Sequence, residues 1–264
     1  MTQSERLNQL IRWLLSEREE YRSIVVPLEM ADKRRLLRAL MNVRPPAPVS
    51  EEFLSVQDEY LQERLRECGV TSLNELTPMQ PGLYLWQGDI TTLGCDAIVN
   101  AANSGMTGCY VPCHGCIDNA IHTYAGVQLR LACEELMRRQ GCEEETGKAK
   151  LTPAFNLPCR YVLHTVGPIT DGCPDEHDME LLASCYRSCL ELAAEYGIRS
   201  TAFCCISTGE FCFPNELAAD IAIRTVKEWQ MEHSDGMEVI FNVFKDADLE
   251  IYRERLGASR AAQA

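Results

Sequence analysis

Thiol and imidazole side chains gather in one short stretch of this sequence, residues 108–116, which contains Cys109, Cys113, His114 and Cys116. Thiolate sulfur and imidazole nitrogen are ligands that zinc prefers in proteins. Adjacent residues such as Cys113 and His114 rarely both face one metal ion without strain, so the preferred ligands are Cys109, His114 and Cys116. Three protein ligands leave one coordination position open for water or substrate, as in catalytic zinc sites. The stretch therefore predicts a Zn²⁺ site of the catalytic kind.

Three other interpretations of this stretch stay open. The zinc site is structural if Cys113 supplies a fourth ligand. The cysteines only pack in a metal-free loop if no ion binds, although apolar packing leaves His114 unexplained. Cys113 and Cys116 also have the spacing of a redox pair, but the surrounding sequence lacks a thioredoxin-like context.

The elements that must position this stretch begin with a helical segment, residues 1–80. Apolar residues from Leu7 to Leu15 follow the spacing of an amphipathic helix. Further helices are expected over residues 30–41 and 50–68, separated by the Pro-rich run at 45–48. Residues 71–81 are interpreted as a connector. The apolar stripes of these helices are expected to dock onto the domain that follows.

From Gly82 onward, apolar strand patterns alternate with helical ones, which predicts a largely parallel sheet covered on both faces. One helix is expected over residues 117–140, and Cys204 and Cys205 are expected in a strand. Ligands in such folds bind at the carboxyl ends of the strands, so the residues just after each strand are the candidate site. These are residues 89–90, 100–103, 165–168, 207–211 and 242–244.

Composition and charge restrict the partners of the protein. The formal net charge of −14 argues against binding to nucleic acid or to an anionic membrane, because phosphate groups need clustered Lys and Arg. The first 20 residues lack the continuous apolar run of a signal peptide, and no stretch approaches a membrane span. We therefore expect a cytoplasmic protein whose 14 cysteines stay reduced. Cys185 and Cys189, four apart on an expected helix, are interpreted as core residues.

Five motifs resemble, in the same order, those of the macrodomain family. They are QGDIT (87–91), NAANSGMTG (100–108), CIDNAIHTYAG (116–126), LHTVGP (163–168) and STGEFCFP (207–214). Most macrodomains carry a run of glycines before the Asp of the third motif, and this sequence has GCYVPCHGC instead. That replacement resembles the zinc-dependent branch of the family, whose signature Cys-x4-His-x-Cys fits Cys109, His114 and Cys116.

The resemblance implies a three-layer α/β/α macrodomain with a mixed, mostly parallel central sheet over residues 81–264, preceded by a helical extension over residues 1–80. It implies an ADP-ribosyl hydrolase that contains zinc. Some members of the branch are encoded with a sirtuin-type ADP-ribosyltransferase and a lipoyl-carrier protein. The expected partners are therefore ADP-ribose and an ADP-ribosylated protein, with a lipoyl-carrier protein as one candidate.

The family motifs assign a binding role to residues at both ends of ADP-ribose. Asp89 and the backbone N–H of Ile90 are expected to contact adenine, on which Phe244 is a candidate for stacking, and Asn242 is an equal candidate for framing it. Backbone N–H groups in the next loop are expected to bind the diphosphate. That loop contains Ser207, Thr208, Gly209, Glu210 and Phe211, of which Gly209 would allow close approach and Phe211 would pack on the proximal ribose.

Asn100 and Asn103 are expected to bind ribose hydroxyls, and Asn103 and Asp118 are the candidate catalytic residues beside the metal. Hydrolysis needs a water and stabilisation of an oxocarbenium-like transition state, and Asp118 is suited to orient or deprotonate that water. Each residue also has a purely structural interpretation. The asparagines would cap turns, Asp118 would cap a helix, and His122 would be a core histidine with satisfied hydrogen bonds, while His164 is expected to be structural.

Three functions follow from the sequence. The preferred one is a zinc-dependent hydrolase that removes mono-ADP-ribose from modified protein side chains. The second is a reader module that binds ADP-ribose without cleaving it, and it requires no open metal site. The third is a deacetylase of O-acetyl-ADP-ribose.

Overall fold

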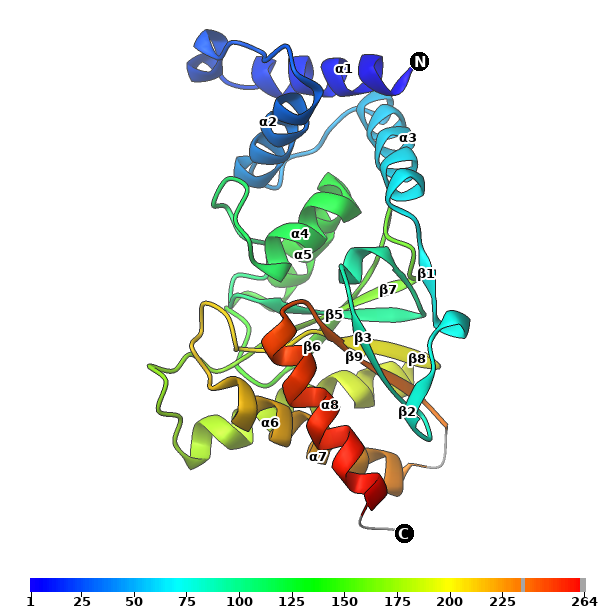
Figure 1. The fold of residues 1–264 in the computed structure, drawn as a ribbon. Helices are drawn as coiled ribbons and strands as arrows, with labels where there is room; N and C mark the ends of the chain where they lie inside the picture. The colour runs from blue at the N-terminus through cyan, green and yellow to red at the C-terminus, as the bar shows by residue number, and fades with distance from the viewer. Residues whose placement is uncertain (234–235, 262–264) are drawn as a thin grey trace.

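A seven-stranded mixed sheet forms the centre of the protein in a computed structural model that describes residues 1–233 and 236–261 (Figure 1). Its five inner strands run parallel to one another, and an antiparallel strand lies at each edge. In spatial order the strands are β2 (Pro78–Gln80), β3 (Leu83–Gln87), β9 (Glu238–Val243), β8 (Ser200–Phe203), β5 (Ala97–Ala102), β7 (Tyr161–Val166) and β6 (Ala149–Pro153). The mixed, mostly parallel sheet predicted from the sequence is confirmed.

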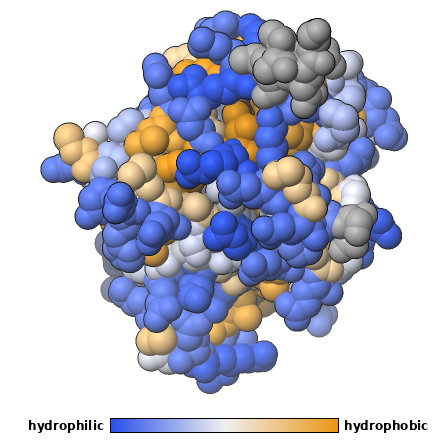
Figure 2. Space-filling model, turned by 90° about the horizontal axis from the view of Figure 1, so that it is seen from below, coloured by the Kyte–Doolittle hydropathy of each residue, from blue (hydrophilic) through white to orange (hydrophobic). Residues whose placement is uncertain are grey.

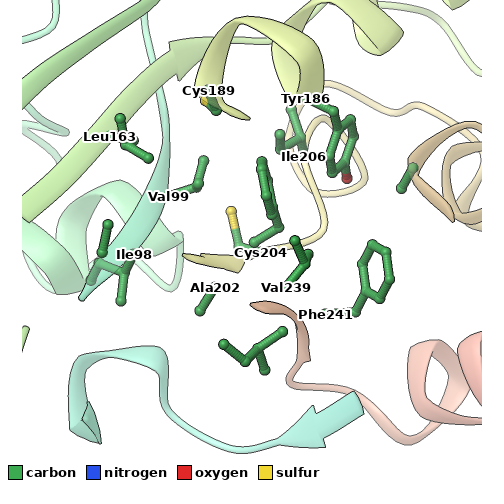
Figure 3. Packing of buried hydrophobic residues seen from close by; sticks show 14 of the residues in the cluster. Ile98, Val99, Leu163, Tyr186, Cys189, Ala202, Cys204, Ile206, Val239 and Phe241 are labelled. Atoms are coloured by element: carbon green, nitrogen blue, oxygen red, sulfur yellow. The ribbon is translucent and has the colours of Figure 1, made fainter. Parts of the chain in front are cut away.

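Helices cover both faces of this sheet, which completes the three layers (Figure 1). One face carries α4 (Ile117–Ala125) and α5 (Val127–Gln140). The other carries α6 (Glu176–Glu195), α7 (Asn215–Glu232) and α8 (Asp246–Ala261). Side chains of the inner strands and of α6 interdigitate in a buried core, in which the predicted packing of Cys185 and Cys189 is confirmed (Figure 3).

Two predicted elements differ from the structure for local reasons. The helix expected over residues 117–140 is broken at Gly126, whose φ of +95° is a left-handed value that glycine adopts without strain. A Cβ at Gly126 would lie 2.6 Å from Nε2 of Gln57, so the close approach of Gln57 also requires glycine. The strand expected to include Cys204 and Cys205 ends at Phe203, where its pairing with β9 ends. Both cysteines therefore lie in the following loop, Cys204 buried and Cys205 half-buried.

The three helices expected near the N-terminus are present as α1 (Gln3–Ser16), α2 (Met30–Val43) and α3 (Glu51–Cys68). A short 3-10 turn, Glu19–Ser23, follows α1. Their apolar stripes pack mainly against one another in a second core, to which the main domain adds Val127. The expected docking of the stripes onto the main domain is seen in this core at Val127, and the rest of the core lies among the three helices themselves.

Hydrogen bonds join α3 to the start of α5. The Gln57 carboxamide oxygen accepts from the backbone N–H of Val127 at 3.0 Å, and the Asp58 carboxylate accepts from Gln128 at 2.8 Å and Asn156 at 2.7 Å. The segment expected to be only a connector contributes the edge strand β2 and a short strand β1 (Thr71–Ser72) paired with β4 (Leu93–Gly94). A 3-10 turn, Leu73–Glu75, separates β1 from β2.

Hydrophilic residues dominate the face of the molecule that Figure 2 shows, with hydrophobic residues visible between them. Among the helices within residues 1–233 and 236–261, none is long and apolar enough to cross a membrane.

Candidate active site

The loops that follow β5, β7 and β8 meet at the carboxyl edge of the parallel strands. The backbone N–H of Thr170, after β7, donates to the carbonyl of Phe211, after β8, at 2.8 Å. His114, after β5, lies with its Nε2 3.5 Å from a carboxylate oxygen of Glu210. Parallel strands place their carboxyl ends at one edge, so motifs more than 90 residues apart come together here.

The structure brings the three predicted zinc ligands together. One ligand atom each of Cys109, His114 and Cys116 lies within 4.8 Å of the other two. Nδ1 of His114 faces Sγ of Cys109 at 3.7 Å. Zinc–sulfur and zinc–nitrogen bonds of about 2.0–2.3 Å place ligand atoms at such separations, so the donor set fits one zinc ion. Cys116 is also the N-cap of α4, where its Sγ accepts from the N–H of Asn119 at 3.4 Å.

Cys113 faces away from this cluster. Its thiol donates to the backbone carbonyl of Arg35 at 3.3 Å, and its N–H donates to the Asn42 side chain at 2.9 Å. Its φ of +54° turns the chain locally and separates its direction from that of His114. This geometry favours the three-ligand set over the four-ligand structural site.

Arginines of α2 and α5 hold the loop of residues 108–116 in place. The Arg38 guanidinium donates to the His114 carbonyl at 2.9 Å and to the Asn119 carboxamide at 2.7 Å. Arg130 of α5 is buried, donates to the Met41 and Asn42 carbonyls near the end of α2, and lies 4.3 Å from the Tyr110 ring centre. None of these support residues was identified from the sequence. The sequence signal that could have identified them is an arginine on the apolar side of an amphipathic helix, where a charged residue is unusual.

Asp118 and the two asparagines form a hydrogen-bonded cluster beside the three ligands. The Asn100 side chain donates to one Asp118 oxygen at 2.8 Å, and the Asn103 side chain reaches the other at 3.4 Å. Asp118 is buried, and loss of hydration raises its pKa to about 6 against the opposing effects of Asn100 and Arg130. The interpretation of Asp118 as the helix cap is wrong, because Cys116 occupies that position.

Asn100 is held from its other side by His164, its partner in the ladder between β5 and β7. The Asn100 amide nitrogen lies 3.2 Å from Nδ1 of His164, and Nε2 of His164 lies 2.9 Å from the Thr152 hydroxyl. Burial lowers the pKa of His164 to about 3, so the ring is neutral and Nδ1 accepts from Asn100. Both amide hydrogens of Asn100 are thereby used, and its buried carbonyl oxygen has no partner within the described residues.

His122 departs from the expectation of a satisfied core histidine. It is buried, but neither ring nitrogen has a hydrogen-bond partner within the described residues, and Nε2 lies 3.5 Å from Asp118. Gly108 packs over the ring, where a Cβ would approach to 2.7 Å. Burial lowers the pKa of His122 well below its usual value, which keeps the ring neutral beside Asp118.

The loop after β8 presents free backbone donors. Across residues 1–233 and 236–261, the N–H groups of Gly209, Glu210 and Phe211 have no acceptor. The loop is closed behind them by a 3.0 Å bond from the Phe213 N–H to the Ser207 carbonyl, with Ser207 at a φ of +64°. Consecutive unpaired N–H groups of this kind bind anions.

Side chains around this loop leave room for a ligand. A Cβ at Gly209 would meet no atom within 4 Å. The Ser207 hydroxyl is buried with no partner in the described chain, whereas the Thr208 hydroxyl donates to the Cys205 carbonyl at 3.0 Å. Gly167 must lack a side chain because a Cβ there would collide with the Ser207 hydroxyl.

The predicted adenine residues lie at the edge formed by β3 and β9. Asp89 caps the 3-10 turn Ile90–Thr92 by accepting from the N–H of Thr91 at 3.0 Å, and the Ile90 side chain is buried. Phe244 is 76% exposed just after β9 and is therefore free to stack. The Asn242 side chain instead donates to the carbonyl of Gly88 at 3.0 Å, which ties β9 to β3.

Comparison with known proteins agrees with this geometry. A family model described as "Macro domain" matches residues 99–222. The chain is 55% identical over 258 residues to a "Protein-ADP-ribose hydrolase" of Treponema medium, with 96% of this chain and 99% of the relative covered. It is 49% identical over 253 residues to a "Protein-ADP-ribose hydrolase" of Staphylococcus aureus strain Mu50, with 95% of each covered. A Trypanosoma brucei macrodomain in complex with ADP-ribose has a TM-score of 0.65 and 31% identity, covering 83% of this chain and 95% of that one.

Proposed function

This chain belongs to the macrodomain family, and we propose that it is a zinc-dependent hydrolase that removes mono-ADP-ribose from modified protein side chains. The hydrolase activity is supported by near full-length relatives named protein-ADP-ribose hydrolase. Zinc dependence and the choice of mono-ADP-ribose are our own inferences. The zinc dependence is supported by the cluster of Cys109, His114 and Cys116.

One observation carries the proposal. A single loop between β5 and α4 places the three soft ligands next to the buried pair of Asn100 and Asp118. A reader module needs the diphosphate loop and the adenine edge, but it has no need of a three-ligand metal cluster beside a buried carboxylate. The arrangement therefore favours bond cleavage over binding alone.

Substrate binding would use the groups that the protein leaves unpaired. The N–H groups of Gly209, Glu210 and Phe211 would hold the diphosphate, and Asp89 would accept from the adenine amine. The orphaned carbonyl oxygen of Asn100 would accept from a hydroxyl of the distal ribose, which satisfies a buried atom that otherwise costs free energy. The anomeric carbon would thereby lie near Asp118.

The chemical step breaks the bond between the anomeric carbon and the modified side chain. A zinc ion held by Cys109, His114 and Cys116 would supply a Lewis acid that polarises a water or a ribose hydroxyl. Asp118 has one oxygen fixed by Asn100, and its other oxygen, only 3.4 Å from Asn103, is available to orient a water and accept its proton. The water oxygen then bonds to the anomeric carbon as the oxocarbenium character decays, and the modified side chain leaves with the electron pair of the broken bond and takes up the proton that Asp118 accepted.

The test is release of ADP-ribose from a mono-ADP-ribosylated carrier protein, with and without a chelator, beside the metal content of the wild type and of Cys116→Ala. We expect about one zinc per chain, loss of that zinc in the variant, and loss of turnover in both metal-free samples. Turnover that persists after complete zinc removal would overturn the zinc dependence. Tight binding of ADP-ribose without release would identify a reader, and faster cleavage of O-acetyl-ADP-ribose would identify a deacetylase.

The protein substrate and the cellular compartment stay predictions. A lipoyl-carrier protein is the proposed substrate class, and the proposed compartment is the cytoplasm. Comparing hydrolysis rates on an ADP-ribosylated lipoyl-carrier protein and on an unrelated protein with the same modification tests the first. Equal rates would contradict it.

A further inference from the structure

A cavity of about 370 Å³ opens between α2, α3 and α4. Four arginines line it, Arg34, Arg35 and Arg38 from α2 and Arg64 from α3. Cys113 of the loop that carries the zinc ligands lines it as well, whereas no residue of the diphosphate loop does. The cavity is therefore separate from the loop of residues 207–211, which is proposed to bind the diphosphate, but it adjoins the loop that carries the predicted zinc ligands.

The charge of this cavity is opposite to that of the molecule. Arg34 and Arg64 share one carboxylate, that of Glu67. Arg38 donates only to neutral oxygens, and Arg35 has no side-chain partner within the described residues and is exposed. Four guanidinium groups and one carboxylate leave about three positive charges here, in a chain whose formal net charge is −14.

The walls between the arginines are apolar. Leu37 and Met41 of α2 and the Tyr60 ring of α3 line the cavity, and a buried Nε of Arg34 has no partner among the described residues. Guanidinium groups bind carboxylates through paired, charge-assisted hydrogen bonds, and the apolar walls accommodate the aliphatic part of the same side chain. A cavity of this size holds one or two amino-acid side chains rather than a nucleic-acid backbone.

We propose that this cavity binds acidic side chains of the substrate protein, in the segment that flanks the ADP-ribosylated residue. The inference rests on the proposed hydrolase function, since it is the modified residue that brings the flanking segment to the loop. Arg38 links the two sites directly, because its guanidinium lines the cavity and donates to the carbonyl of His114 at 2.9 Å. Each extended residue spans about 3.3 Å, so a few residues of substrate reach from one site to the other.

The experiment compares two peptides that carry the same mono-ADP-ribosylated residue, one flanked by Glu and one flanked by Gln. We expect a KM about tenfold lower for the Glu-flanked peptide with the same kcat, and a rise of that KM with added salt. Arg35→Glu is expected to remove this preference. Arg224→Glu, at an exposed position of α7, makes the same charge change and is expected to keep it.

Two further measurements separate this inference from the proposed function. Titration with free ADP-ribose reports the proposed ADP-ribose site alone, and Arg35→Glu is expected to bind ADP-ribose as the wild type does. Binding of an unmodified Glu-flanked peptide, followed by fluorescence polarisation, reports the cavity even if no peptide is hydrolysed. Equal KM values for the two peptides in the wild type, or equal peptide affinity of wild type and Arg35→Glu, would overturn the inference.

Discussion

Asp118 is the residue on which the proposed chemistry depends most. One of its oxygens is committed to Asn100 at 2.8 Å, and the other is held only weakly by Asn103. Asp118→Asn keeps the shape and one acceptor oxygen but removes the group that orients and deprotonates water. We expect kcat to fall by about 10²- to 10⁴-fold.

The affinity for ADP-ribose distinguishes a variant that has lost the chemical step from one that has lost its fold. The Asp118→Asn variant is expected to keep its affinity within a few-fold in a calorimetric titration, and Asp32→Asn, at an exposed position of α2, is expected to change neither quantity. Full turnover in Asp118→Asn would exclude Asp118 from catalysis.

Glu210 is a carboxylate in a loop that is expected to bind a diphosphate, which is electrostatically unfavourable unless it has another task. Its oxygen lies 3.5 Å from Nε2 of His114, whose Nδ1 faces the Cys109 sulfur. A carboxylate on the far nitrogen of a metal-binding histidine orients the ring and raises its basicity. Glu210→Gln is therefore expected to lower zinc affinity by about tenfold.

Competition with a zinc-sensitive dye measures this effect without relying on activity. Glu180→Gln, an exposed position on α6, serves as the control and is expected to bind zinc as the wild type does. Unchanged affinity in Glu210→Gln would show that Glu210 does not act through His114.

Functional residues were predictable from the sequence where the residues that act together lie close to one another along the chain. Cys109, His114 and Cys116 stand within eight positions, and the structure brings them together as expected, although their roles stay predictions. Arg38 and Arg130 were not predictable, because their hydrogen bonds to and from α2 join positions 76 to 89 residues apart. No periodicity or spacing within one element carries information about such contacts.

Among the elements, α2 makes the most direct contacts with the loop of residues 108–116, which carries the predicted zinc ligands. The Asn42 side chain is buried, accepts from the N–H of Cys113 at 2.9 Å and donates to the Thr123 hydroxyl at 2.9 Å. Asn42→Ala takes the acceptor from the half-buried N–H of Cys113 and the donor from the buried Thr123 hydroxyl, which still donates to the carbonyl of Asn119 at 2.7 Å. Two hydrogen bonds are lost, so we expect a loss of about 1–3 kcal/mol in unfolding free energy. Amide hydrogens of residues 109–116 should also exchange faster.

Asn8→Ala on α1 is the matched control, because Asn8 lies on the same helical extension and its side chain makes no hydrogen bond to any of the residues 1–233 and 236–261. Exchange in residues 109–116 that stays equal in the Asn42 variant and the wild type would show that α2 does not hold the loop.

Gly126 separates α4 from α5, and a substitution there tests why the helix breaks. Gly126→Ala places a Cβ at a φ of +95° and 2.5 Å from the Gln128 carboxamide oxygen, so we expect a destabilisation of about 1–3 kcal/mol in chemical unfolding. Gly257→Ala, in α8 with no atom within 4 Å of the new Cβ, should instead stabilise by up to about 1 kcal/mol. Equal effects of the two substitutions would contradict this account of the break.

The elements show clearly why some were predictable and others were not. The inner strands β5, β7 and β9 are almost entirely buried and rich in apolar residues, although each also contains a buried polar residue such as Asn100, His164 or Asn242. Their positions therefore follow mainly from hydrophobicity. The edge strands β2 and β6 are short and mostly half-exposed, and they exist because a neighbouring strand supplies their hydrogen-bond partners. The helix break was missed because apolar spacing continues through Gly126.

For the whole molecule, two large hydrophobic cores and a small cluster of Ala102, Met106 and Val166 determine what metal removal can do. The larger core lies between the sheet and its helices, and the second lies among α1, α2 and α3. Neither core contains Cys109, His114 or Cys116. We therefore expect zinc to stabilise the folded protein by binding it, without the fold itself depending on the ion.

A thermal scan tests this coupling. Zinc at about 100 times its Kd adds roughly 2.7 kcal/mol to the folded state, which raises Tm by about 5–10 °C for a domain of this size. We expect a chelator to lower Tm by that amount while the far-ultraviolet circular dichroism at 25 °C stays unchanged. Cys116→Ala should melt near the chelated wild type and should not respond to zinc. Unfolding at 25 °C on chelation would mean that the loop supports a core, and a Tm indifferent to zinc would mean that the three ligands do not bind it.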